Sequence, residues 1–192
     1  MAAAKMLDDD ALNALLGVIE QTSRHKQRDR AMIYLGIYAG LRIREICLLE
    51  WRMILKPDGK TLDDQITLTN AASKGCSARN IPIHPRLKEA LESLPRTGRW
   101  VITTERSRDQ PASTVAAGNH IKRLATRAGL IGISSHSARK RFATKIALNL
   151  GVRTNTTITT LQGLLGHKSA QTTQIYINSA TPEQQANLVA LL

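Results

Sequence analysis

A tyrosine and a histidine that could do chemistry stand close together near the end of the chain. Tyr176 follows His167 by nine residues in the segment GLLGHKSAQTTQIYINS, residues 163–179, which contains no acidic residue. If the tyrosine hydroxyl faces solvent beside the histidine, it can attack a phosphate as a nucleophile. A tyrosine between two isoleucines is otherwise typical of a hydrophobic core, so the rest of the sequence must decide between the two.

Displacement at a phosphate without metal ions requires cations that hold the nonbridging oxygens and an acid that protonates the departing oxygen. Arginine suits the first role because its planar guanidinium can bind two oxygens and keeps its charge. The candidates are Arg42 in AGLRIRE, Lys74 in SKGCSAR, and His136 with Arg139 in HSAR. A spacing of three residues puts His136 and Arg139 on one face of a helix. Each of these motifs is weak when taken alone.

The charge balance favours a polyanionic partner. The chain of 192 residues carries a formal net charge of +12 and has a pI of about 10.3, which favours nucleic acid before a membrane surface. No Asp or Glu occurs between residues 110 and 182, which disfavours a metal site built from carboxylates. Cys47 and Cys76 stand far apart and form no CxxC pair, so neither a zinc site nor a disulfide is indicated.

The order of these motifs carries more information than any one of them. G-L-R-x-x-E, then a lysine between two predicted strands, then H-x-x-R, then L-G-H with a tyrosine nine residues later resemble the catalytic domain of the tyrosine recombinases of the phage integrase type. The resemblance covers nearly the whole chain. It implies strand cleavage and rejoining through a 3′-phosphotyrosine, with no metal or nucleotide cofactor. The implied catalytic residues are the phosphate-binding Arg42 and Arg139, the acid Lys74, the supporting His136 and His167, and the nucleophile Tyr176.

Further residues have implied roles around this set. Glu45 lies three residues after Arg42 and is expected to orient it, although an ordinary surface ion pair would show the same spacing. The residues expected to bind DNA are Arg44, Lys140, Arg141 and Lys168. Family members often have a small residue at the position of Arg44 and a histidine at that of Lys140, and both departures keep or add positive charge.

The elements that must position these residues are mostly helical. Apolar residues at helical spacing predict helices over residues 11–21 and 28–40, the second of them central and ended by Gly40. Alternation predicts two strands, QITLT and RNIPI. Further helices are expected over 85–94, 112–130, 134–150, 159–167, 169–177 and 182–192. We therefore expect a mainly α fold with a small antiparallel β-sheet.

The chain is expected to be a single catalytic domain, residues 1–192, without the N-terminal core-binding domain that many family members carry. Either the domain is excised, with MAAAK as a vector remnant, or it belongs to a minimal subgroup. The apolar segment 182–192 is too short to be stable alone, and we expect it to dock on a neighbouring protomer, with packing in its own protomer as the alternative. The expected partners are double-stranded DNA and further protomers, as a dimer or tetramer on DNA, with no membrane, in the cytoplasm.

Three other classes stay open at this stage. One is a DNA-binding module without catalysis, in which residues 134–148 form a basic recognition helix and Tyr176 has no chemical role. The second is a type IB topoisomerase-like enzyme, which resembles the recombinases in its Arg, Lys, His and Tyr chemistry but relaxes supercoils. A helical domain unrelated to nucleic acids is the third and plainest alternative.

Overall fold

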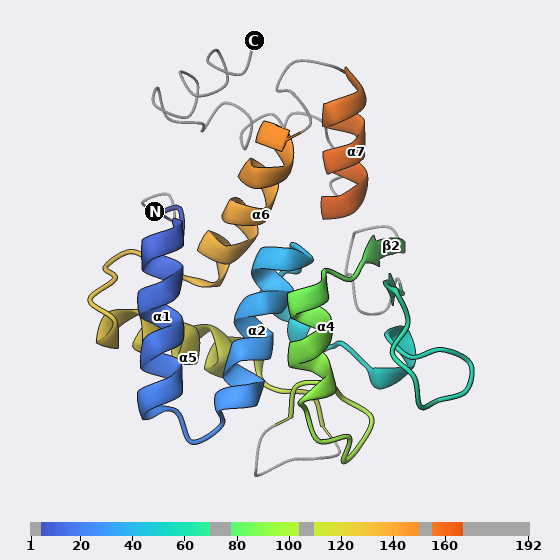
Figure 1. Cartoon of the computed structure of the whole chain (residues 1–192), viewed down its shortest axis with the longest axis horizontal. Coiled ribbons are helices and arrows are strands. Elements are labelled where there is room, and N and C mark those ends of the chain that lie inside the picture. The colour runs from blue at the N-terminus through green and yellow to red at the C-terminus, as the bar shows by residue number, and fades with distance from the viewer. Residues whose placement is uncertain (1–4, 70–77, 104–109, 150–154, 167–192) are drawn as a thin grey trace.

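The computed structural model describes residues 5–69, 78–103, 110–149 and 155–166. Within these ranges helices predominate, and two short strands form a single antiparallel sheet (Figure 1). The elements are α1 (Asp9–Thr22), α2 (Lys26–Tyr38), α3 (Ile43–Cys47), the 3-10 helix η1 (Trp51–Met53), β1 (Gln65–Leu68), β2 (Arg79–Pro82), α4 (Pro85–Glu92), α5 (Thr114–Arg127), α6 (Ser135–Asn149) and α7 (Asn155–Leu165). The predicted fold class is confirmed.

Local sequence signals explain where several elements begin and end. The Asp8 carboxylate accepts a hydrogen bond from the Ala11 amide at 2.8 Å and caps α1, as expected for an acidic N-cap. Gly40 has a φ of 63° directly after α2, a left-handed conformation that ends the helix. In the sheet, Ile66 pairs with Ile81 and Leu68 pairs with Arg79, so a basic residue shares the inward face of β2 with a buried isoleucine.

Helix α2 is the centre of the molecule, as its apolar circumference predicted. One face packs with α3, the sheet and α4 through residues such as Met32 and Leu35. The opposite face packs with α1 and α5 through Ile33 and Ile37. Because both sides of α2 are buried, the backbone that follows it, including Gly40, is held firmly at the point where α3 begins.

Helices α6 and α7 pack against each other through a small apolar cluster that includes Phe142, Ala143 and Leu165. In Figure 1 they lie at one end of the molecule, with the lower part of α6 against α2. This packing brings the first turns of α6 and the end of α7 to the α2–α3 connection. Three segments that are distant in sequence therefore meet beside the sheet.

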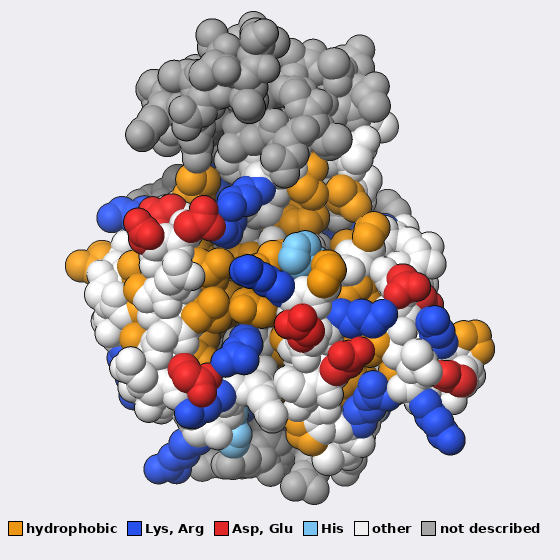
Figure 2. All heavy atoms as spheres, viewed as in Figure 1, with side chains coloured by type: hydrophobic (Ala, Val, Ile, Leu, Met, Phe, Trp, Pro, Cys, Tyr) orange, Lys and Arg blue, Asp and Glu red, His pale blue; other side chains and the backbone are white. Residues whose placement is uncertain are grey.

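Charged side chains of both signs share the surface over α1, α2 and α4 (Figure 2). Several form exposed ion pairs, such as Arg30 with Glu20 and Lys88 with Asp64, which contribute little to stability. In contrast, α5, α6 and α7 contain no acidic residue. No helix in the described ranges is long and apolar enough to cross a membrane.

A buried carboxylate joins three helices away from the α2–α3 connection. Asp29 is fully buried and accepts hydrogen bonds from Ser23 at 2.6 Å and from Arg28 at 2.9 and 3.0 Å. The His120 ring nitrogen of α5 lies 2.7 Å from the same carboxylate. Burial alone would raise the pKa of Asp29, but the hydrogen bonds from His120 and Ser23 and the charge of Arg28 outweigh it, so the pKa lies below 3.8.

This network predicts an acid-labile contribution to stability. Because the folded pKa of Asp29 lies below its ordinary value of 3.8, the contribution is complete above that pH and is lost as the pH falls toward the folded pKa. We expect Asp29→Asn to lower the free energy of unfolding at pH 7 by about 2 kcal/mol. Urea unfolding between pH 7 and pH 3 should give a shallower pH dependence for the variant than for wild type. The exposed Asp10→Asn is the control, and equal slopes for wild type and Asp29→Asn would contradict the prediction.

Candidate active site

The α2–α3 connection carries the first pair of predicted site residues. Arg42 is the N-cap of α3, and its amide donates to the Glu45 carboxylate at 2.8 Å. Arg42 Nη1 also donates to Glu45 Oε1 at 3.3 Å. The Glu45 side chain is 2% exposed whereas that of Arg42 is 33% exposed. The contact that the spacing of three residues predicts is therefore present, and Arg42 faces solvent from a backbone that Glu45 fixes.

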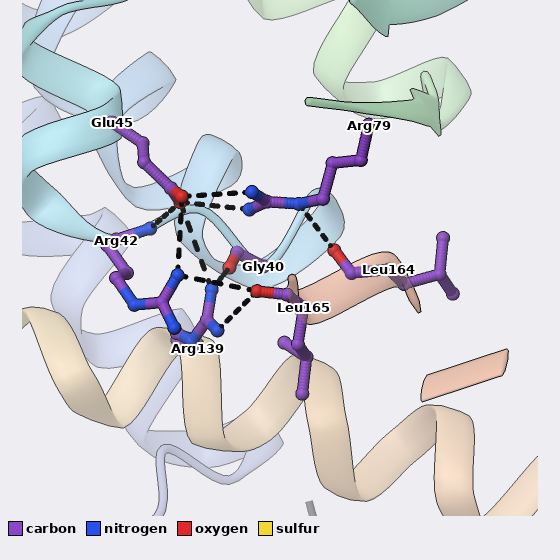
Figure 3. A network of polar contacts seen from close by, with 7 residues as sticks. All are labelled: Gly40, Arg42, Glu45, Arg79, Arg139, Leu164 and Leu165. Atoms are coloured by element: carbon purple, nitrogen blue, oxygen red, sulfur yellow. Dashed lines mark hydrogen bonds and ion pairs between the residues drawn. The ribbon is translucent and has the colours of Figure 1, made fainter. Parts of the chain in front are cut away.

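Arg139 reaches the same place from α6. Its guanidinium donates to the Gly40 carbonyl and, through Nη2, to the Leu165 carbonyl at 2.8 Å (Figure 3). Arg42 Nη1 donates to the same Leu165 oxygen at 3.4 Å. The carbonyls at the end of a helix carry partial negative charge, so the end of α7 attracts both arginines. The two arginines that sequence reasoning assigned to phosphate binding thus lie side by side.

A third arginine, which sequence reasoning missed, completes the cluster. Arg79 at the start of β2 donates from Nη1 and Nη2 to the two Glu45 oxygens at 3.0 Å each. Its Nε donates to the Leu164 carbonyl at 3.0 Å. A usable signal was in the sequence: strand alternation places Arg79 on the face of the buried Ile81. A buried arginine requires an acidic partner.

The cluster of Arg42, Glu45, Arg79 and Arg139 has an excess of two positive charges, because three guanidiniums surround one carboxylate. Burial alone would raise the pKa of Glu45. The hydrogen bonds and charge of Arg79, the Arg42 amide and the charge of Arg139 lower it further than burial raises it, so the pKa lies below 4.5. Glu45 is therefore ionised at neutral pH, and the net charge of the cluster suits an anionic ligand.

The other predicted residues of α3 and α6 differ in their surroundings. His136 lies one turn before Arg139 and is exposed, as is Arg44 on α3, and Lys140 is half-buried. Arg141 is buried and donates to the Leu7 carbonyl at 2.8 Å and to the Asp9 carboxylate. Its contacts attach α6 to the start of α1, which favours a structural role over the predicted contact with DNA.

Four predicted residues, Lys74, His167, Lys168 and Tyr176, lie outside the described residues. Described residues lie close to two of them in the sequence. Arg79 stands five residues after Lys74, and α7 ends two residues before His167. Among the described residues, no group of three or more His, Cys, Asp or Glu side chains could hold a metal ion.

Comparison with known proteins identifies the family. Residues 5–183 match the phage integrase family. The chain belongs to that family. Among its relatives, the tyrosine recombinase XerA of Thermococcus kodakarensis is 33% identical over 177 residues, which is 90% of this chain and 57% of XerA. The tyrosine recombinase XerD of Vibrio cholerae is 29% identical over 187 residues, or 92% of this chain and 58% of XerD. The chain thus spans less than two thirds of the length of either relative.

Solved structures of phage integrase relatives share the fold. The crystal structure of a XerA recombinase has a TM-score of 0.75 at 21% identity, covering 97% of this chain and 62% of that one. The integrase from mycobacterium phage Brujita has a TM-score of 0.63 at 25% identity, covering 98% of this chain and 58% of that one. A lambda integrase tetramer bound to a Holliday junction has a TM-score of 0.66 at 21% identity, covering 88% of this chain and 49% of that one.

Gly166 has no room for a side chain. It is the middle residue of the L-G-H motif, which is part of the resemblance to this family. Its φ is 62°, and an added Cβ would lie 2.8 Å from Arg79 Nη1. We expect Gly166→Ala to lower the free energy of unfolding by roughly 1–2 kcal/mol, the cost of a left-handed alanine. Gly163→Ala is the matched control, since an added Cβ there meets nothing within 4 Å. It should stabilise the exposed face of α7 by about 0.5–1 kcal/mol; denaturant unfolding of both variants checks the opposite signs.

Proposed function

We propose that this chain is the catalytic domain of a site-specific DNA recombinase, which cuts and rejoins DNA through a 3′-phosphotyrosine without a metal ion. The observation that carries the proposal is the meeting of Arg42 and Arg139 at the Leu165 carbonyl, 3.4 and 2.8 Å away. Two guanidiniums held side by side form a suitable site for the nonbridging oxygens of a phosphodiester. The sequence continues from this point directly to His167.

In the proposed reaction the Tyr176 hydroxyl attacks the phosphorus atom in line with the 5′ oxygen. The tyrosine hydroxyl loses its proton to solvent as a bond forms between its oxygen and phosphorus, and the bond from phosphorus to the 5′ oxygen breaks. Lys74 supplies the proton that the departing oxygen needs, while His136 and His167 support the phosphate. The free 5′ hydroxyl of a partner duplex then returns a proton to Lys74 and attacks the phosphotyrosine. The bond from phosphorus to the tyrosine oxygen breaks, and Tyr176 regains a proton, so the energy of the broken bond is conserved.

Arg42 and Arg139 accelerate the first step because they stabilise the negative charge that the nonbridging oxygens carry in the transition state. Preorganised charges that need not move during the reaction contribute most to the rate. Arg139 is preorganised in this sense, since it is buried and donates to two backbone carbonyls. We propose that the exposed Arg44 and the half-buried Lys140, together with Lys168, bind the flanking DNA backbone.

The partners of the chain are proposed from its relatives. Solved structures with a similar fold include a lambda integrase dimer bound to a core site and a lambda integrase tetramer bound to a Holliday junction. We propose that this chain also acts as a dimer or tetramer on DNA, in the cytoplasm, and that residues 182–192 dock on a neighbouring protomer. Deleting these residues should then abolish higher-order complexes on DNA but leave monomer binding intact; unchanged complexes would contradict the docking.

A covalent trapping experiment tests the function. Labelled duplex DNA from the region that encodes the chain is nicked beside the candidate cleavage positions, so that the cleaved strand diffuses away and the adduct accumulates. A band shifted on a denaturing gel, and a nucleotide-linked peptide containing residue 176 in mass spectrometry, are the expected results. Strand exchange between two duplexes supports a recombinase, while relaxation of a single supercoiled circle alone supports the topoisomerase alternative. DNA binding with no adduct would contradict both enzymatic proposals.

A further inference from the structure

Arg79 uses its guanidinium in a way that differs from the other two arginines of the cluster. Its side chain is 6% exposed, close to the 4% of Arg139 and far below the 33% of Arg42, so its contacts and not its burial set it apart. Three of its N–H groups bind acceptors within the protein, two on Glu45 and one on Leu164. Arg79 is thus placed to act through its neighbours and not on a bound phosphate.

The acceptors of Arg79 belong to the segments that carry the predicted catalytic residues. Glu45 holds the backbone of Arg42, and Leu164 belongs to the last turn of α7, just before the L-G-H motif. Arg79 itself begins β2, five residues after Lys74. One side chain therefore connects the start of β2, where Arg79 pairs with the last residue of β1, with α3 and with the end of α7.

The distances around Glu45 show which arginine neutralises it. Arg79 meets both carboxylate oxygens at 3.0 Å, whereas the nearest guanidinium nitrogens of Arg42 and Arg139 lie 3.3 and 3.9 Å away. A two-pronged pair is the strongest contact that a carboxylate makes with arginine. Without Arg79, the buried negative charge of Glu45 would draw Arg42 and Arg139 closer, because a buried charge must be compensated.

We propose that Arg79 is a positioning residue. Its bidentate ion pair with Glu45 keeps that carboxylate from binding the phosphate-binding Arg42 and Arg139 tightly. Its Nε hydrogen bond to the Leu164 carbonyl fixes the end of α7. This inference rests on the proposed function. It predicts that the fall in the rate of adduct formation when Arg79 is replaced comes largely from the unpaired carboxylate of Glu45. Removing the charge of Glu45 at the same time should therefore restore activity.

The test measures single-turnover adduct formation on nicked DNA for wild type, Arg79→Met, Glu45→Gln and the double variant. We expect Arg79→Met to lower the rate per folded molecule about 100-fold, the size of effect that displacing a reacting group by about 1 Å can have. The dissociation constant for DNA should change less than about threefold, because Arg79 directs its N–H groups to Glu45 and Leu164 and not to the DNA. The double variant should react about ten times faster than Arg79→Met, since the glutamine oxygen can still accept from the Arg42 amide.

Two further variants separate positioning from general stability. Arg79→Lys keeps the charge but cannot bind Glu45 and Leu164 together, so its rate should lie between those of wild type and Arg79→Met. Arg99→Met is the control, because Arg99 pairs with another buried carboxylate, Glu50, at 2.9 Å outside the cluster; its rate per folded molecule should equal that of wild type.

The possible outcomes have distinct meanings. An adduct in wild type with recovery in the double variant supports the inference. An adduct in wild type, but a double variant no faster than Arg79→Met, would show that Arg79 is merely structural. A rate for Arg79→Met that equals wild type per folded molecule would overturn the inference as well. If wild type and Arg99→Met bind DNA but form no adduct, the proposed function itself fails, and this inference fails with it.

Discussion

Replacing Tyr176 by phenylalanine should abolish the covalent protein–DNA adduct while leaving DNA binding within about threefold of wild type. The substitution removes one oxygen and keeps the ring, so packing by the ring is preserved. Without that oxygen there is no bond to phosphorus, and water is a poor substitute in a site arranged for a tethered nucleophile. We expect the rate of strand cleavage to fall by a factor on the order of 10⁴ or more, measured by denaturing gels under single-turnover conditions.

The chain contains three tyrosines, so replacing each of the other two by phenylalanine tests every alternative tyrosine nucleophile. Tyr34 and Tyr38 form an edge-to-face pair with ring centroids 5.1 Å apart, and burial raises the pKa of Tyr34, so its phenolate is disfavoured. Tyr34→Phe and Tyr38→Phe should each keep the full rate per folded molecule. An adduct that survives Tyr176→Phe, or that is lost in either control, would assign the nucleophile elsewhere.

The elements of the fold could be predicted because their signals are local. The Asp8 cap, the left-handed Gly40 and the proline that opens α4 each act within one helical turn. The strands of the sheet were recognisable because their alternation persists over a few residues and a single hairpin joins them. Sequence reasoning works well where the partner of a residue is its near neighbour along the chain.

The site was predictable only in part, for the same reason. Arg42 and Glu45 are three residues apart, so their contact follows from helical geometry. The pair between Arg79 and Glu45 spans 34 residues, and the hydrogen bond from Arg79 to Leu164 spans 85. The spacing of residues along the chain does not reveal contacts over such distances in sequence. Only the inward position of Arg79 on its strand indicated that it must have an acidic partner.

Arg141 shows a further limit of local signals, which place a charge on an element but do not report its surroundings. A basic stretch of α6 suggested that successive side chains face one ligand. Residues two apart on a helix point in directions about 200° apart, and Arg141 accordingly binds Leu7 and Asp9 while Arg139 binds Gly40 and Leu165. A DNA contact by Arg141 stays a prediction that its burial makes unfavourable.

Arg139→Lys has the second largest expected effect, although it conserves the charge. One ammonium cannot donate to the Gly40 and Leu165 carbonyls and also bind a phosphate, because it lacks the planar fork. We expect the rate of strand cleavage per folded molecule to fall roughly 100- to 1000-fold, as for other losses of a preorganised donor. The free energy of unfolding should fall by about 1–3 kcal/mol because a buried carbonyl loses its donor.

The matched control is Arg28→Lys, which removes the fork that binds the buried Asp29 at 2.9 and 3.0 Å outside the cluster. It should cost stability without changing the rate per folded molecule, whereas Arg139→Lys should change both. Comparing rates at a temperature where both variants are fully folded separates the two effects. If both variants slow cleavage equally, the guanidinium of Arg139 acts only through folding. A loss confined to Arg139→Lys means that its geometry, and not its charge alone, stabilises the transition state.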